Sequence, residues 1–343
     1  MMPDPEQERR MTTTDQGIPP ETYRQPLYKR VLGVSEIGVL VAVVVFFVIF
    51  TVANKSMANP ENLVRMALQG SFLGLAAFAM AFLMIAGEID LSSGATAGLG
   101  AAVAGALMMN LGWSEWASCA AALAVAVLVG LLNAFIVLKI RMPSFFATLG
   151  TSFLVSGLAI WILKGAWFYV GDQIPSLLKV LNPSPLFALP WIFIALLIAY
   201  LVGDFLMRTS RLGPTLTAVG GNRRAAEIVG INVPLVKTLC FVLVSVCCGL
   251  AGILVMVYSG TTDATIGDGW LLWVIAIAII GGGSLRGGTG SIIGVLFGTI
   301  LIQVIRMGLL NANVQTNAQG IVVGAILLGA ASLDALRRRS VRY

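Results

Sequence analysis

Two carboxylates stand in a short polar break between two long apolar runs, in the stretch Gly87-Glu88-Ile89-Asp90-Leu91-Ser92-Ser93-Gly94. Carboxylates in such a place cost free energy unless water or a partner stabilises them. One interpretation is that Glu88, Asp90 and Ser92 line the inner end of a path and offer hydrogen bonds to polyhydroxyl solutes. The alternative is a tight inner turn whose acids are exposed to water. In either case Asp90 is a good N-cap residue for the next helix.

Hydroxyl residues gather at the start of another apolar run, which opens with the sequence PSFFATLGTS at residues 143–152. Proline suits the first turn of a helix, because its missing amide would be unpaired there. Most of these hydroxyl groups fall on one helix face. This face either binds solute or, as is more common, packs against a neighbouring helix. The candidate path residues here and in the preceding run are Asn133, Phe145, Thr148, Thr151 and Ser152.

A polar, basic island occupies residues 207–237, between apolar runs that are each long enough to cross a bilayer. Asn222 is a preferred N-cap residue, and Gly230 suits the position just past a helix C-terminus. The pattern predicts a short capped helix at residues 222–230, outside the membrane. Such a helix either meets a partner protein or is an ordinary solvated loop helix.

A glycine-rich stretch, GGGSLRGGTG, covers residues 281–290. Glycine-rich loops can bind phosphate, but neither a Gly-Lys-Ser/Thr sequence nor a preceding strand accompanies this one. Glycines also let membrane helices approach closely, and we expect that use here.

Composition excludes several function classes. Histidine is absent, and the four cysteines lie in apolar runs, so we expect no catalytic residues, no metal site and no disulfides, and small core roles for the thiols. The cations stand at the ends of apolar runs rather than in a basic stripe with aromatics, which argues against nucleic acid. With 58% hydrophobic and 11% charged residues, the chain is expected to be an all-α polytopic membrane protein.

About ten transmembrane helices are predicted, at about 20 apolar residues per span. The eighth is so short that we expect it to be broken or tilted. The predicted spans lie near residues 35–53, 63–87, 93–111, 116–139, 145–163, 187–207, 236–258, 270–282, 290–308 and 314–333.

Charge placement orients these spans. With both termini in the cytoplasm, 17 of the 22 lysines and arginines fall on the inner side, as the positive-inside rule requires. The chain then divides into a cytosolic, disordered tail at residues 1–34, a membrane domain at 35–335 with a cytosolic loop at 208–236, and a basic cytosolic tail at 336–343.

Four motifs, in order, carry a resemblance to a known family. GEIDLSSG, PSFFATLGTS, AVGGNRRAAEIVGI and IGGGSLRGGTGS resemble the permease of bacterial ABC importers of the ribose/monosaccharide type. That family's usual forms are close to GGIDLSVG, PSFIATLGT, AIGGNxxAAxxSGI and IGGTSLxGGxGS. The resemblance covers roughly residues 60–335 and does not specify the solute.

The resemblance implies a function and partners. The chain would be a subunit in the inner membrane that imports a sugar or polyol, paired with a second copy or a close paralogue. A periplasmic binding protein would deliver the solute. ATP and Mg would bind a separate cytosolic ATPase, and this chain would bind no cofactor. An autoinducer-like or nucleoside solute remains an alternative, as does the different class of an ion-coupled secondary transporter.

The resemblance also assigns residues to coupling. The ATPase would dock on the 222–230 helix, with Ala225, Ala226, Ile228 and Val229 packed into a groove of the partner. The expected coupling residues are Gly220, Gly221, Asn222, Arg223, Ala225, Ala226, Glu227 and Gly230.

Three features that matter depart from the family pattern. The usual Gly-Thr-Ser before the glycine-rich loop is Gly282-Gly283-Ser284. An arginine often found before Gly157-Leu158 is Ser156 here, and two acidic positions of the usual GYELDAIAA are Leu271 and Trp273. We hypothesise that these losses compensate one another within one charge network. The alternative is a different solute.

Overall fold

The computed structural model describes residues 35–182, 189–314, 320–322, 324–325 and 328–329. The predicted tails at 1–34 and 336–343, and most of the tenth predicted span, lie outside the described residues.

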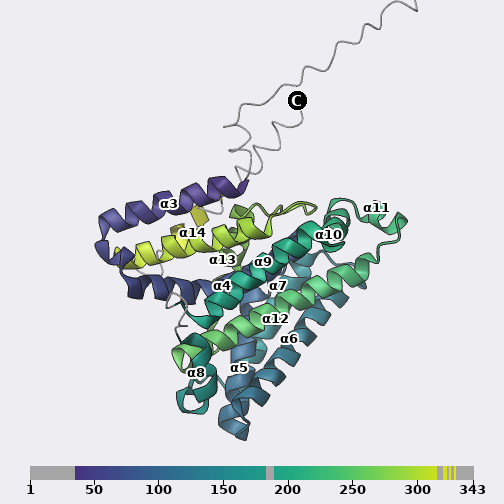
Figure 1. The fold of residues 1–343 in the computed structure, drawn as a ribbon. Helices are drawn as coiled ribbons and strands as arrows, with labels where there is room; N and C mark the ends of the chain where they lie inside the picture. Colours follow the sequence, from purple (N-terminus) through teal and green to yellow (C-terminus); the bar gives the residue numbers. More distant parts are fainter. Residues whose placement is uncertain (1–34, 183–188, 315–319, 323, 326–327, 330–343) are drawn as a thin grey trace, which may run out of the picture. The chain divides into compact units, whose positions relative to one another are not determined.

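Eight of the described helices are long and apolar enough to cross a membrane (Figure 1). Each coincides within a few residues with a predicted span, which confirms the all-α, polytopic class. The number of spans and their orientation stay predictions. The eight helices are α3 (Ser35–Ala53), α4 (Pro60–Ile85), α5 (Ser93–Leu111), α6 (Glu115–Leu138), α7 (Ser144–Leu163), α9 (Trp191–Thr209), α12 (Val233–Ser259) and α14 (Ile292–Asn311).

Shorter elements lie between these helices. They are η1 (Lys55–Ala58), β1 (Phe168–Tyr169), η2 (Gly171–Gln173), α8 (Pro175–Leu181), α10 (Leu212–Gly221), α11 (Arg223–Ile228), β2 (Thr261–Thr262) and α13 (Trp270–Ile280). The two strands form an antiparallel pair in which Phe168 is opposite Thr262.

The short eighth predicted span is α13, which has 11 residues. A non-helical segment connects it to α12 and lies along α5. The two backbones are in close contact. A methyl group added at Gly98 would come within 2.6 Å of the Ile266 carbonyl oxygen, and a methyl group added at Gly94 would overlap the Gly267 carbonyl oxygen. Non-helical backbone beside a membrane helix is tolerated where protein covers it. The shortness of this helix agrees with the sequence, and the expectation of a broken or tilted span stays a prediction.

The core surrounds α4 and α12. Helix α12 packs against α4, α5 and α6, and α4 also contacts α9, α13 and α14. Small residues allow this, since lipid gives helices no hydrophobic reason to associate and close packing must hold them together. All four cysteines are buried, which agrees with the core roles predicted for the thiols.

Candidate functional site

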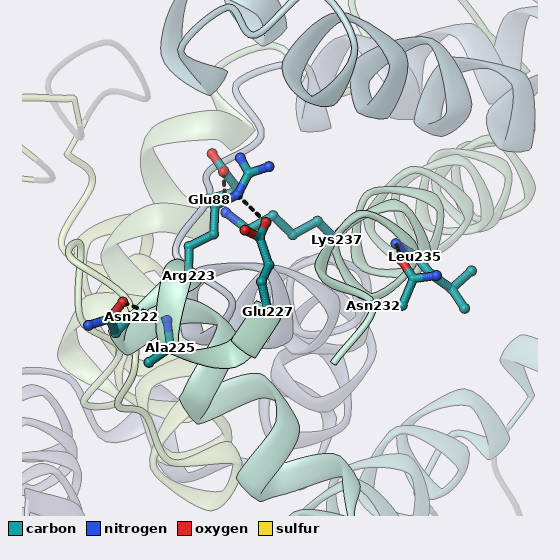
Figure 2. Close-up of polar contacts among 8 residues, drawn as sticks. All are labelled: Glu88, Asn222, Arg223, Ala225, Glu227, Asn232, Leu235 and Lys237. Atoms are coloured by element: carbon teal, nitrogen blue, oxygen red, sulfur yellow. Dashed lines mark hydrogen bonds and ion pairs between the residues drawn. The ribbon is translucent and has the colours of Figure 1, made fainter. Parts of the chain in front are cut away.

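Helix α11 is the capped helix that the sequence predicts (Figure 2). Asn222 has extended backbone angles, and its side-chain oxygen accepts a hydrogen bond from the Ala225 amide at 3.1 Å. Gly230 follows the helix with a φ of 85°, a conformation that glycine adopts without strain. The Ile231 amide donates to the Ala226 carbonyl at 3.0 Å and closes the C-terminal end. Local hydrogen bonds therefore define both ends of the helix.

Some side chains of α11 are exposed to solvent and others are buried. Ile228 and Val229 are 86% and 72% exposed, and Ala225 is exposed as well. Arg223 donates to Glu227 at 2.9 Å on the surface (Figure 2). Ala226, however, is 1% exposed and packs in the main core cluster. Our expectation that Ala226 enters a partner's groove is therefore wrong, because its methyl group points into its own chain.

Helix α10, which the sequence did not separate from α11, ends at the glycine pair Gly220-Gly221 and lies beside α11 (Figure 1). Gly220 packs backbone to backbone: an added methyl group would overlap the Ile85 carbonyl oxygen and come within 2.6 Å of the Gly288 amide nitrogen. Gly288 also donates to the Ile85 carbonyl at 2.8 Å. A methyl group on Gly287 would also come within 2.5 Å of the Gly87 Cα. Three motifs distant in sequence thus meet beside the end of α4, and the expected close approach of the glycine-rich stretch is confirmed.

Glu88 forms an ion pair with Lys237, at 2.6 Å from Oε1 to Nζ (Figure 2). Their side chains are only 15% and 8% exposed. Lys237 lies near the N-terminus of α12, shortly after α11. The pair therefore connects the start of α12 to the break between α4 and α5.

Asp90 is fully buried and satisfied within the chain. Its Oδ1 accepts from the amide and the hydroxyl of Ser92, and its Oδ2 accepts from Asn133 Nδ2 at 3.1 Å. Asn133 also donates to the Ser92 hydroxyl oxygen at 2.9 Å. Burial raises the pKa of Asp90, and the hydrogen bonds from Ser92 and Asn133 oppose this. The interpretation of a turn with water-exposed acids is wrong for Asp90, because this network replaces water.

The threonines on the hydroxyl face of α7 are buried and form hydrogen bonds within the chain. Thr148 is buried, donates to the Ser144 carbonyl at 2.7 Å and accepts from the Leu91 amide at 2.9 Å. Thr151 is buried and donates to the Ala147 carbonyl. Ser152 is partly exposed, and Phe145 is exposed on the outside of α7. Of the candidate path residues, the structure connects Asp90, Ser92, Asn133 and, through Leu91, Thr148. Their role in a path stays a prediction.

Lys237 is the site residue that the sequence reasoning missed. It appeared only as one of the inner cations, because spacing along the chain does not show that it faces a carboxylate 149 positions away. A signal existed in the motif itself, where Glu88 replaces the glycine of the usual form GGIDLSVG.

Among the described residues, no group of three or more His, Cys, Asp or Glu side chains is placed to hold a metal ion.

Comparison with known sequences decides the family. Residues 62–331 match the family described as "Branched-chain amino acid transport system / permease component". The chain belongs to this permease family. The permease is 30% identical over 308 residues to the L-arabinose transport system permease protein AraH of Escherichia coli (strain K12), with 90% of this chain and 93% of AraH covered.

A second relative is the Autoinducer 2 import system permease protein LsrC of Enterobacter sp. (strain 638). It is 29% identical over 313 residues, which cover 91% of this permease and 90% of LsrC. The resemblance noted in the four motifs is confirmed. This permease is a multi-pass protein of the inner membrane and a transport subunit of an importer rather than an enzyme.

Proposed function

We propose that this permease forms the translocation path for a sugar or polyol in an ATP-driven importer. A periplasmic binding protein delivers the solute, and a separate cytosolic ATPase docks on α11. The exposed apolar pair Ile228–Val229 on a capped helix between membrane spans carries the proposal. Exposed apolar side chains outside the spans are typical of an interaction surface.

The names of two relatives support the proposed cargo. One relative is named for L-arabinose and another for autoinducer 2, which supports a small polar solute. An autoinducer-like solute is the second candidate for this reason, and a nucleoside remains the other alternative. The candidate path residues Glu88, Asp90, Ser92, Asn133, Phe145, Thr148, Thr151 and Ser152 are proposed to lie along or beside the path.

The proposed cycle uses two permease subunits, as identical copies or close paralogues. ATP and Mg bind the ATPase pair, whose closure draws the two α11 helices together. The spans then rearrange and open the path to the outside. Release of ADP and phosphate reverses the movement, and the solute enters the cell. The permease itself binds no cofactor in this scheme.

The buried position of Ala226 decides which variant tests docking. A carboxylate at position 226 would be placed in the core and would destabilise the fold, so loss of activity there would be uninformative. Ile228→Asp instead places the charge on the exposed face of α11. Leu178→Asp is the matched control, since Leu178 is an exposed apolar residue of α8, remote in sequence from the coupling loop.

The experiment co-expresses the permease with the ATPase and the binding protein encoded beside it and purifies the complex on the permease. ATP hydrolysis is then measured in nanodiscs against a panel of sugars, polyols and nucleosides presented with the binding protein. We expect one solute to stimulate hydrolysis, Ile228→Asp to abolish co-purification of the ATPase, and Leu178→Asp to preserve it. Full docking and uptake by Ile228→Asp would refute the proposal.

The competing class, an ion-coupled secondary transporter, makes the opposite prediction. Uptake by such a transporter would collapse with a protonophore or sodium ionophore and would not need the ATPase. We expect uptake in ATP-loaded vesicles to be insensitive to ionophores.

A further inference from the structure

We propose that the segment 87–92 transmits movement of α11 to α6 and α7, and that the Glu88–Lys237 ion pair is the connection by which α12 moves this segment. The inference rests on the proposed function, because it names the residues through which docking at α11 would reach the membrane spans. We call residues 87–92 the relay segment.

The relay segment is contacted by both elements that flank α11. On one side α10 ends at Gly220, and a methyl group on Gly87 would come within 3.3 Å of the Gly220 Cα. On the other side α12 contributes Lys237, which binds Glu88 at 2.6 Å. The relay segment therefore lies between the element before α11 and the element after it.

The connections of α11 to these two elements are short and hydrogen-bonded. Asn222 is at once the C-cap of α10 and the N-cap of α11. After α11, the Ile231 amide donates to the Ala226 carbonyl, and Asn232 caps α12 by accepting from the Leu235 amide at 3.1 Å (Figure 2). Little slack is left in this backbone, so a force on Ile228 and Val229 displaces α10 and α12 as well.

The other end of the relay segment holds two membrane helices. Asp90 Oδ2 accepts from Asn133 of α6, and the Leu91 amide donates to Thr148 of α7. These groups are buried, and breaking a buried hydrogen bond leaves an unsatisfied polar group. The inner ends of α6 and α7 are therefore expected to follow the relay segment when it moves.

The ion pair suits the role of a connection for two reasons. Both side chains are largely removed from water, so separating the charges is costly and the two residues move together. In addition, the usual family form GGIDLSVG has glycine where this chain has Glu88. The motif itself therefore does not need a carboxylate at this position. A role for Glu88 that depends on its ion pair with Lys237 explains why the carboxylate is present.

The test uses the complete complex in nanodiscs, with the binding protein and a solute that stimulates hydrolysis. The first variant combines Glu88→Gln with Lys237→Met, which removes both charges and leaves neither alone in the interior. The second combines Glu88→Lys with Lys237→Glu, which restores an ion pair in reverse. Asp204→Asn is the matched control, because it breaks the 2.7 Å pair with Arg208 inside the single helix α9.

Two ratios are measured on folded complex: solute-stimulated over basal ATP hydrolysis, and solute imported per ATP. We expect the neutral double variant to bind the ATPase normally and to lose at least about five-fold in both ratios, the lower end of typical coupling between sites. The reversed pair should recover both ratios, and Asp204→Asn should leave them unchanged. A purely structural role would lower the yield or the melting temperature without changing either ratio.

Wild-type ratios in the neutral double variant would overturn the inference, as would a folded reversed pair that stays uncoupled. Either result would leave the proposed function intact, since the wild-type complex would still show solute-stimulated hydrolysis. Absence of that stimulation in the wild type, over the whole solute panel, would instead refute the proposed function.

Discussion

The guanidinium of Arg306 lies over the indole ring of Trp273, with its Cζ 5.3 Å from the ring centroid. Arg306 belongs to α14 and Trp273 to α13, so the contact joins a long span to the short helix. None of the three ion pairs found among the described residues includes Arg306. A cation over an aromatic face is stabilised by the ring quadrupole. Trp273 occupies a position where the family pattern has an acid. The position that lost the acid therefore faces the cation of Arg306. The proposed compensation involving Ser156 and Leu271 stays a hypothesis.

The first prediction concerns this contact. Trp273→Leu should destabilise the permease by at least about 1 kcal/mol, because Arg306 then lacks its ring in a membrane span. Trp273→Asp should recover part of this loss by forming an ion pair, although it also gives up the packing of the indole. Thermal unfolding in detergent measures both. Equal stability of the Leu and Asp variants would show that the charge of Arg306 has no need of a partner.

The second prediction concerns the meeting of three motifs at Gly220. Gly220→Ala should destabilise the permease by about 1–3 kcal/mol, since the new methyl group meets backbone atoms that cannot rotate away. Gly221→Ala is the control, because the nearest atom to its new methyl group is the Gly288 Cα at 4.0 Å. The melting temperatures of the two variants should differ clearly. A Gly220→Ala variant as stable as Gly221→Ala would contradict the close packing.

The third prediction concerns the cap of α11. Asn222→Ala removes the acceptor for the Ala225 amide and should destabilise this helix by about 1 kcal/mol. Asn222→Asp keeps an acceptor and should be close to the wild type. Hydrogen exchange of the amides at residues 223–228 measures the local effect, and ATPase affinity should weaken in parallel. Unchanged exchange in Asn222→Ala would mean that the cap does not stabilise α11.

The fourth prediction concerns pH. Because burial raises the pKa of Asp90 above 3.8, the folded state holds this proton at pH values where the unfolded chain has lost it. The contribution of Asp90 to stability is therefore largest at pH values below its pKa in the unfolded chain. It decreases as the pH rises through its pKa in the folded protein. The melting temperature of the wild type should therefore fall relative to that of Asp90→Asn as the pH rises above 4. A difference independent of pH would contradict the raised pKa.

Much of this molecule was predictable from local sequence. Apolar runs of sufficient length give the eight long helices, because a bilayer requires each spanning segment to satisfy its own backbone hydrogen bonds. The cap of α11 was equally local, since Asn222 and the Ala225 amide that donates to it are three residues apart. The shortness of α13 followed from the length of its apolar run alone. In each case the determining interactions lie within one segment of chain.

The tertiary structure decided the rest, because the decisive partners are distant in sequence. The sequence of the short helix α11 did not predict the burial of Ala226, because its residues do not distinguish a buried face from an exposed one. The pairing of Glu88 with Lys237 and of Trp273 with Arg306 depends on which helices become neighbours. The same holds for Asp90, because its burial depends on a partner 43 positions away, Asn133 of α6. Periodicity places a side chain on a face of its own helix, but only packing determines what that face meets.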